Sequence, residues 1–263
     1  MELSILIRGG GEVASAIAHK LYHSHFQVCL TEIPQPLAIS RGASFSEAIY
    51  EGLKEVAGVV ARRVDSYEDV ASTWMDKEVP LLVDPTAGVV GYLKPDVVID
   101  AIMAKRNTGT KMDDAPFVIG VGAGFCVGKD CHAVVETNNS ENLGQVIFEG
   151  EAEPNTGIPL EVGQLTQERA MFAPMDGIFV SLLEIGDMVK AGDDIGRVES
   201  KSVRAQIDGM LRALLRSGLW IKRGTKLGEV DPRRERWLCN AIRPRMRTIA
   251  GGVLEAIMMH FNK

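Results

Sequence analysis

Three consecutive glycines lie near the start of the chain, between an apolar segment and a segment with helical spacing. Gly9, Gly10, Gly11, Glu12, Val13 and Ala14 fit the pattern G-x-G-x-x-A. In this pattern the glycines permit a tight turn and the close approach of a phosphate, and the small residue permits contact between helix and strand. Glu32 follows Gly11 by 21 residues (32 − 11), where a carboxylate can accept a hydrogen bond from a ribose hydroxyl. The loop predicts a nucleotide-like ligand; the alternative is a turn whose glycines serve packing alone.

A second glycine cluster follows a later apolar segment. Gly120, Gly122 and Gly124 come directly after it, and Asp84 and Asp100 each end an apolar segment of their own. Because ligands of open sheets bind at the carboxyl ends of the strands, we expect Asp84, Gly122 and Gly124 to line one crevice with the first loop. Basic and amide side chains follow at Lys105, Arg106 and Asn107. This set suits a phosphorylated or carboxylated ligand; the alternative is that these are ordinary caps and turn residues.

The sequence shows no pair of nucleophile and base. None of the five histidines has an obvious serine or cysteine partner, so the sequence identifies no catalytic residue. Cys126, Cys131 and His132 are close in sequence, but a four-ligand zinc site needs more donors at suitable spacing. We therefore expect no metal site.

The elements that would position these residues alternate along the first part of the chain. Leu3–Arg8, Val28–Ile33 and Val56–Arg63 are typical of strands, and Glu12–His23 has the apolar spacing of a helix. Such alternation predicts a Rossmann-like parallel sheet domain over residues 1–152. Prolines and glycines then crowd together, which indicates a linker over residues 153–170.

An internal repeat follows, offset by 32 residues (209 − 177, from Gly177 to Gly209). Ala173-Pro-Met-Asp-Gly-Ile returns as Ala205-Gln-Ile-Asp-Gly-Met, and glycine and apolar positions recur in the same register without a gap. The pattern predicts two units that pack about a pseudo-twofold axis over residues 171–233. It resembles the barrel-sandwich hybrid of biotinyl and lipoyl carriers, which is a small all-β module. The chain as a whole would then join an α/β domain to this module. Lys201 stands at the position of the carriers' modified lysine, although their usual flanking residues are absent; the alternative is an exposed turn lysine.

The last segment, residues 234–263, contains an apolar stripe of helical spacing from Thr248 to Phe261, so we expect a helix that packs back on the first domain. Six arginines between Arg233 and Arg247 stand against one acid, Glu235. This cluster is either a solvated face or a local anion site.

Composition excludes some partners. The net charge is −6 (29 − 35), which gives no general attraction to nucleic acid or to an anionic membrane. No window approaches the apolar length of a membrane span, and the start lacks the pattern of a signal peptide. We expect a cytoplasmic protein.

Longer strings carry a resemblance to one family over essentially the whole chain. They include Gly9–Ala14, Thr31–Ile33, Phe45–Gly52, Val83–Pro85, Pro95–Ile102, Ala104–Asn107, Val134–Thr137, Pro154–Gly157, Val230–Arg233 and Gly251–Ala256. The sequence resembles the YqeB-like proteins of the selenium-dependent molybdenum hydroxylase system. Its first domain is more distantly similar to XdhC-type accessory proteins, which mature a molybdenum cofactor. Ala123 and Cys126 depart from the residues expected in the second glycine segment.

The resemblance implies an accessory protein that matures a selenium-dependent molybdenum hydroxylase. Its ligand would be a nucleotide, NAD-like or otherwise, or a molybdenum-cofactor-type phosphate held in the crevice, and its partners would be the client hydroxylase or cofactor-loading proteins. The β module or the tail would dock the client. The alternatives are an NAD(P)-dependent oxidoreductase or other small-molecule enzyme, and a carrier acylated at Lys201. The oligomeric state is left open, a homo-oligomer included.

Overall fold

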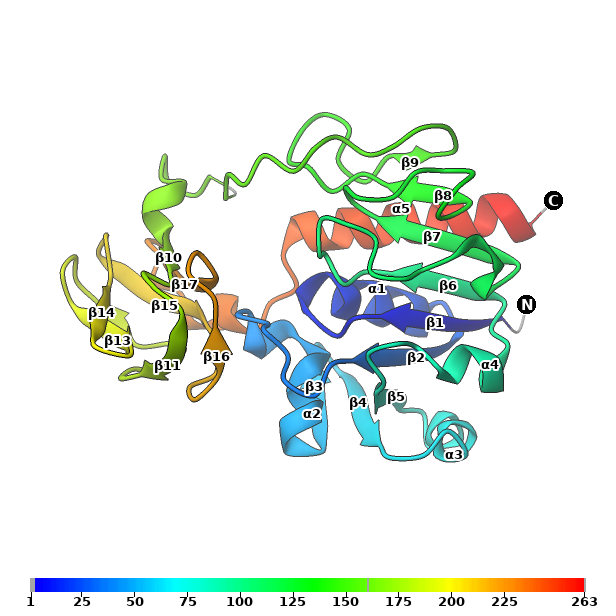
Figure 1. The fold of residues 1–263 in the computed structure, drawn as a ribbon, viewed down its shortest axis with the longest axis horizontal. Helices are drawn as coiled ribbons and strands as arrows, with labels where there is room; N and C mark the ends of the chain where they lie inside the picture. Colours follow the sequence, from blue (N-terminus) through cyan, green and yellow to red (C-terminus); the bar gives the residue numbers. More distant parts are fainter. Residues whose placement is uncertain (1–2, 160, 263) are drawn as a thin grey trace. The chain divides into compact units, whose positions relative to one another are not determined.

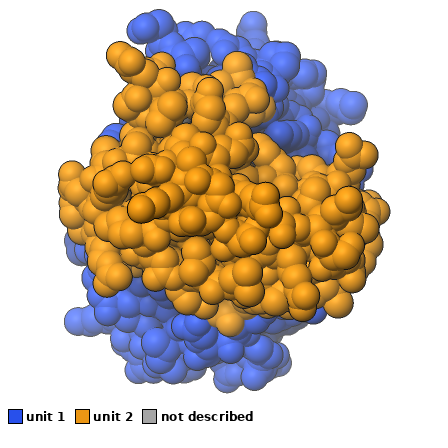
Figure 2. All heavy atoms as spheres, turned by 90° about the vertical axis from the view of Figure 1, so that its left-hand side faces the viewer, with its two compact units in different colours: residues 1–36, 44–156, 242–263 blue, residues 37–43, 157–241 orange. Residues whose placement is uncertain are grey.

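The chain folds into two compact units in a computed structural model that describes residues 3–159 and 161–262. Unit 1 comprises Met1–Pro36, Ser44–Thr156 and Ile242–Lys263. Unit 2 comprises Leu37–Ala43 and Gly157–Ala241, and Figure 2 colours the two units separately. Leu37–Ala43, which the sequence placed in the first domain, therefore belongs to the same unit as the repeat.

Unit 1 is built on a nine-stranded mixed sheet with the strand order β3-β4-β5-β2-β1-β6-β7-β8-β9 (Figure 1). From β1 the chain passes to its neighbour β2, forms β3 and β4 at the sheet edge, and returns with β5 between β4 and β2; β6 then pairs with the other side of β1. The β strands of unit 1 are β1 Ser4–Arg8, β2 Gln27–Glu32, β3 Leu53–Val56, β4 Val59–Val64, β5 Val79–Val83, β6 Val97–Asp100, β7 Phe117–Val121, β8 Ala133–Val135 and β9 Val146–Ile147. Its α-helices are α1 Glu12–His23, α2 Ala48–Glu51, α3 Asp69–Met75, α4 Val89–Leu93 and α5 Pro244–Phe261.

Both faces of this sheet are covered, because successive side chains of a strand point to opposite faces. Ile5 and Ile7 of β1 pack in a core shared with α1 and α5, whereas Leu6 packs in a second core with residues of α3 and α4. The central strands consequently consist almost entirely of buried apolar residues. The predicted helix over Glu12–His23 is confirmed with the same bounds.

The prediction of a Rossmann-like, parallel sheet was wrong. Strands β4, β5, β2, β1, β6, β7 and β8 are parallel, but β3 pairs antiparallel with β4 and β9 pairs antiparallel with β8. At the first edge, Ala57 and Gly58 both adopt positive φ, +49° and +85°. That conformation is typical of a two-residue hairpin turn. The expected strand Val56–Arg63 is therefore a hairpin, and the sheet is mixed.

Unit 2 consists of two four-stranded antiparallel sheets, with the orders β10-β17-β15-β12 and β14-β13-β11-β16. The 32-residue offset relates the sheets strand by strand, because β11 corresponds to β15, β12 to β16 and β13 to β17. The strands are β10 Ala170–Phe172, β11 Gly177–Ser181, β12 Met188–Val189, β13 Asp194–Val198, β14 Lys201–Arg204, β15 Gly209–Leu214, β16 Trp220–Ile221 and β17 Lys226–Asp231. The predicted duplication is thus visible in the strand order.

The assignment of this unit to a biotinyl/lipoyl-type barrel-sandwich module was wrong. The strands form two separate antiparallel sheets around one apolar core that includes Phe179, Ile195, Leu211 and Leu227. A repeat of glycine and apolar positions fixes which strands are equivalent, but it does not fix how the two sheets pair. The inserted segment Leu37–Ala43 adds to unit 2, since the N–H of Leu214 donates to the carbonyl of Ile39 over 2.9 Å.

Candidate functional site

The candidate site lies at the carboxyl edge of the unit 1 sheet, where the chain direction across the sheet reverses. β1 pairs with β2 on one side and with β6 on the other, and α1 and α4, which come before β2 and β6 in the chain, pack on opposite faces of the sheet. Such a reversal is where open sheets offer a crevice to a ligand. The first glycine loop follows β1 at this point, and α1 begins at Glu12 immediately after it.

The three glycines of this loop have different local surroundings. Gly9 adopts φ +102°, and a Cβ there would lie 3.0 Å from the carbonyl oxygen of Ala101. A Cβ on Gly10 would lie 3.2 Å from the backbone of Ser46. Packing therefore explains the first two glycines.

Gly11 differs from its neighbours. A Cβ at Gly11 would meet nothing within 4 Å, and its φ of −69° suits any residue. Neither packing nor backbone conformation requires glycine at this position. Gly11 is also the N-cap of α1, where the positive end of the helix favours an anion. The absence of a side chain leaves space beside the helix terminus.

Hydrogen bonds to Glu32 connect this loop to the end of β2. Its Oε2 accepts a hydrogen bond from the N–H of Gly10 over 2.8 Å, and its Oε1 accepts one from the N–H of Ile33 over 2.7 Å. Burial raises the pKa of the Glu32 carboxyl, and these two N–H groups counteract that rise. The structure therefore places Glu32 beside the first glycine loop, where its carboxylate holds backbone N–H groups; the ribose hydroxyl that the sequence predicts as its donor stays a prediction.

The rest of the first motif belongs to α1 and its packing. Val13 and Ala14 are buried in the core of unit 1. Glu12 pairs with Arg243, which precedes α5, through two contacts of 2.7 and 3.0 Å. This bidentate ion pair is mostly buried and connects the start of α1 to the start of α5.

At the same edge of the sheet, the sequence placed Asp100 but not the buried polar cluster that Asp100 forms with Arg8 and Thr110. The hydroxyl of Thr110 donates to Asp100 over 2.6 Å and accepts a hydrogen bond from the guanidinium of Arg8. Arg8 and Asp100 are both almost fully buried, and Nη1 of Arg8 lies 3.6 Å from Oδ2 of Asp100. Burial raises the pKa of Asp100. The available signal was an arginine at the end of an apolar strand, a residue that is rarely buried without a partner.

Asp84 serves the loop that follows β5. One carboxylate oxygen accepts the N–H of Val89 over 2.9 Å, and the hydroxyls of Tyr67 and Thr86 lie 3.4 and 3.3 Å from the carboxylate. A buried carboxylate with these partners orients the short helix α4. The backbone N–H of Asp84 also donates to the carbonyl of Glu32, and this hydrogen bond links the ends of β5 and β2.

The second glycine cluster is explained by packing. A Cβ on Gly120 would lie 2.5 Å from the ring of Phe125, and a Cβ on Gly122 would lie 2.5 Å from the hydroxyl of Thr137. Gly124 adopts φ +107°, and its Cβ would lie 2.6 Å from the backbone of Arg106. These positions exclude even a methyl group, so close packing alone accounts for their glycines.

Residues after β6 and β8 likewise hold loops in place. Lys105 and Arg106 are exposed, whereas the side chain of Asn107 accepts the N–H groups of Gly109 and Thr110 and donates to Asp130 over 3.1 Å. Glu136, which sequence reasoning also missed, is buried and accepts three N–H groups, from Thr137, Asn138 and Glu153, over 2.6 to 2.7 Å.

A pocket of about 360 Å³ lies at the same edge of the sheet, at the ends of β4 and β5. Its lining residues are Val64, Asp65, Ser66, Tyr67, Glu68, Leu82 and Val83. None of them was among the predicted site residues.

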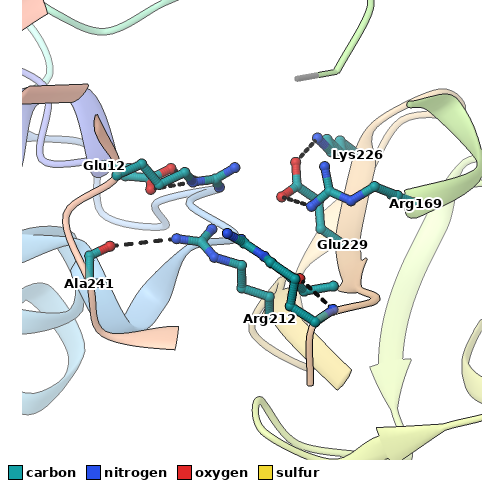
Figure 3. A network of polar contacts seen from close by, with 9 residues as sticks. Glu12, Arg169, Arg212, Lys226, Glu229 and Ala241 are labelled. Carbon is teal, nitrogen blue, oxygen red and sulfur yellow. Dashed lines mark hydrogen bonds and ion pairs between the residues drawn. The ribbon is translucent and has the colours of Figure 1, made fainter. Parts of the chain in front are cut away.

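Unit 2 holds its own charged network. Arg169 and Lys226 both point at the carboxylate of Glu229 (Figure 3). Arg212 directs a guanidinium N–H toward the carbonyl of Ala241, 3.5 Å away. Arg169, Arg212 and Glu229 are all buried.

The arginines of the basic segment are divided among several partners. Arg233 pairs with Asp231 over 2.6 Å, Arg234 lies 3.7 Å from Asp208, and Arg243 pairs with Glu12. Arg245 donates to the carbonyl of Thr137 over 3.1 Å. The segment thus combines separate ion pairs, not one cluster of basic side chains.

Lys201 is exposed, but it does not stand at the tip of a turn. It pairs with Val198 as the first residue of β14, so the turn itself is Glu199–Ser200. The carrier hypothesis depended on the biotinyl/lipoyl fold, which the two separate sheets of unit 2 contradict.

The cysteines and histidines do not assemble into a centre. All four cysteines are free; Cys29, Cys131 and Cys239 are buried, and Cys126 is half-buried. In the described part of the chain, no three His, Cys, Asp or Glu side chains gather closely enough to hold a metal ion. None of the helices within residues 3–159 and 161–262 has both the length and the apolar character needed to span a bilayer.

Comparisons with solved structures give distant likenesses only. The ectoine utilization protein EutE (DoeB) from Ruegeria pomeroyi, in its product-bound structure, covers 87% of this chain and 85% of its own at 13% identity, with a TM-score of 0.26. An aspartoacylase family protein from Mesorhizobium loti covers 88% and 85% at 10% identity, with a TM-score of 0.27. A succinylglutamate desuccinylase/aspartoacylase from Rhodobacter sphaeroides covers 87% and 85% at 14% identity, with a TM-score of 0.25. TM-scores this low do not define the fold, which rests on the strand order described above.

Sequence comparison is more informative. No protein-family model matches the chain. The Uncharacterized protein YqeB of Escherichia coli (strain K12) is 42% identical over 255 residues, which cover 97% of this chain and 47% of that protein. The chain spans about half the length of the curated relative it matches. Along nearly all of its length, the sequence is therefore YqeB-like.

Proposed function

We propose that this chain is an accessory protein in the maturation of a selenium-dependent molybdenum hydroxylase, and that it binds a nucleotide or a cofactor phosphate at Gly11. The YqeB-like sequence motivates the pathway. The single observation that carries the binding site is the difference among the three glycines. Packing requires Gly9 and Gly10, but nothing in the structure requires Gly11 except space beside the positive end of α1.

The surroundings of Gly11 support a role in binding more than one in catalysis. Glu32 and Asp100 have buried or partly buried carboxylates whose oxygens accept hydrogen bonds from their own loops. Arg8 contributes a buried cation at the end of β1. A loop held rigidly by such contacts is suited to keep a ligand in one orientation. The β strands of unit 2 and α5 would then be available to a client protein.

The test is Gly11→Asp, studied in the full chain. Aspartate is a favoured N-cap residue and has open space at this position, so the variant should fold as the wild type does. Its charge and size would oppose a phosphate. Calorimetric titration with ADP and with pyrophosphate should show binding to the wild type and its loss in Gly11→Asp, together with loss of client activation.

Gly91→Asp is the matched control, because a Cβ at Gly91 also meets nothing within 4 Å and its φ is not positive. That variant should bind and activate normally. Unchanged activation of the client by Gly11→Asp would refute the proposed site.

An NAD(P)-dependent oxidoreductase is the second candidate, favoured by the position of Glu32 at the end of β2. A carboxylate there disfavours the 2′-phosphate of NADP(H). Titration with NADH and NADPH separates the candidates: tight binding of NADH and turnover of a substrate would support the oxidoreductase, and absence of binding by both would remove it.

A further inference from the structure

We propose that the pocket at the ends of β4 and β5 binds a nucleoside group, a nitrogen heteroaromatic ring with its sugar, that belongs to the same ligand whose phosphate lies at Gly11. This inference rests on the proposed function and extends it, because it names the class of ligand: a purine nucleotide in place of a simple phosphate. The pocket is lined by Val64, by the four residues that follow it, Asp65, Ser66, Tyr67 and Glu68, and by Leu82 and Val83.

The strand register connects this pocket to Gly11. β1 lies beside β2, β2 beside β5, and β5 beside β4, and all four run parallel. Glu32 at the end of β2 is in register with Val83, which lines the pocket, and Leu82 is in register with Val64. Three inter-strand spacings of about 4.8 Å separate β1 from β4, which gives roughly 14 Å along the edge of the sheet. An extended nucleoside diphosphate suits this separation better than a compact anion does.

Glu32 occupies the middle of this path. Its Oε2 lies 2.8 Å from the N–H of Gly10 at one side, and its backbone carbonyl accepts the N–H of Asp84 at the other over 3.0 Å. Each oxygen of the Glu32 carboxylate can accept a second hydrogen bond besides the one from its backbone N–H donor. A sugar hydroxyl that passes over the end of β2 could donate to it.

The lining of the pocket determines which end of the ligand it accepts. Val64, Leu82 and Val83 supply apolar surface, and the phenol of Tyr67 supplies an aromatic one. The charged lining residues are both acidic, Asp65 and Glu68, and no basic side chain is in the lining. Arg63 pairs with Asp65 over 3.0 Å and offsets part of this charge. A lining with acidic and no basic side chains favours an uncharged ring that bears amino or hydroxyl donors over a phosphate.

Tyr67 is held in place before any ligand arrives. Its hydroxyl donates to Asp84 over 3.4 Å, and its ring lies 5.9 Å from the ring of Tyr92, centroid to centroid. An aromatic side chain fixed at both its ring and its hydroxyl loses little freedom when a flat group packs against it. Stacking of a base on an aromatic side chain is a large, sequence-tolerant contribution to nucleotide binding.

The experiment compares pyrophosphate, ADP and adenosine by calorimetry with the full wild-type chain. ADP should bind about 5- to 150-fold more tightly than pyrophosphate, the gain expected from one stacked base. Val83→Trp, which fills the pocket from a half-buried position, should remove this gain and leave the affinity for pyrophosphate unchanged. Leu53→Trp is the matched control: Leu53 is an exposed apolar residue of β3 outside the pocket, and this variant should bind like the wild type.

The outcomes separate this inference from the proposed function. Equal affinities for ADP and pyrophosphate in the wild type, a comparison that needs no variant, would overturn the nucleoside pocket and leave the phosphate site intact. Binding of adenosine that Val83→Trp abolishes, without any binding of pyrophosphate, would uphold the pocket and overturn the phosphate site at Gly11. If pyrophosphate, ADP and adenosine all fail to bind, both are overturned.

Discussion

Substitutions in the first glycine loop should affect the free energy of unfolding differently at Gly9, where packing leaves no room for a side chain, and at Gly11, where a side chain has open space. Gly9→Ala places a methyl group 3.0 Å from the carbonyl oxygen of Ala101 and 3.2 Å from Cα of Ile102, in a backbone with φ +102°. The left-handed conformation costs a non-glycine residue about 1–2 kcal/mol. Displacement of a packed backbone adds about 1–3 kcal/mol. Unit 1 should therefore lose on the order of 2–5 kcal/mol of unfolding free energy.

Gly11→Ser should behave differently, although it lies only two residues away. Serine suits φ −69°, meets nothing within 4 Å and is a better N-cap than glycine. Its unfolding free energy should stay within about 0.5 kcal/mol of the wild type or exceed it. The pair thus compares two glycines of one loop that differ in backbone conformation and in local contacts.

Urea unfolding measures both effects if the fluorescence reports unit 1 alone. Of the three tryptophans, Trp74 lies in α3 of unit 1 and donates its indole N–H to the carbonyl of Val28 over 2.8 Å. Replacing the exposed Trp220 and Trp237 with phenylalanine leaves Trp74 as the sole indole. A Gly9→Ala midpoint equal to that of the parent would refute the packing argument for this loop, and a large loss in Gly11→Ser would refute the claim of open space.

Three further predictions test the contacts around the site. Because the pKa of Glu32 is raised in the folded state, its contribution to stability is complete below its ordinary value of 4.5 and is lost as the pH rises through the raised value. As the pH rises through this raised pKa, the wild type should therefore lose stability relative to Glu32→Gln. Urea midpoints of the two proteins measured across the pH range would show this, and a difference in midpoint that stays constant with pH would contradict it. Arg243→Ala should cost about 1–3 kcal/mol of unfolding free energy, because it leaves a mostly buried Glu12 without its bidentate partner, and high salt should restore little of it. Burial raises the pKa of Cys131 to about 11, so mass spectrometry after brief iodoacetamide treatment at pH 8 should find Cys126 labelled before Cys131, and the reverse order would be inconsistent with the structure.

Local sequence signals predicted elements well where each element follows from its own residues. The helix Glu12–His23 has its apolar residues on one stripe, and the repeat specified which strands of the two unit 2 sheets are equivalent. The edges of the large sheet were not predictable in this way. The hairpin between β3 and β4 depends on a positive φ at Ala57, a residue that rarely adopts it, and neighbouring apolar residues on both sides made one continuous strand appear plausible.

The site shows the same division between local and long-range information. The position of Glu32 beside the first glycine loop follows from the order of adjacent strands, but the sequence predicted a ribose hydroxyl, not the N–H of Gly10, as the donor to its carboxylate. The packing of Gly122 against Thr137 and of Gly124 against Arg106 brings together loops that no local pattern relates. For this reason sequence reasoning interpreted the second glycine cluster as a ligand loop, although its glycines permit close contacts between backbone segments.

The acidic residues at the strand ends determine how a ligand could be recognised at this edge. Glu32, Asp84, Asp100 and Glu136 each end or follow a strand, and each accepts at least one backbone N–H from a loop. Donors directed at a carboxylate offset part of its negative charge, so these acids oppose a nearby phosphate less than their number implies. Because their oxygens already hold the loops, replacing them would alter loop geometry before it altered ligand contacts. Gly11 has no side chain with such a duty, and a substitution there can therefore attribute a loss of binding to the ligand itself, whereas Val83 also packs against the core of unit 1 and Val83→Trp needs its matched control.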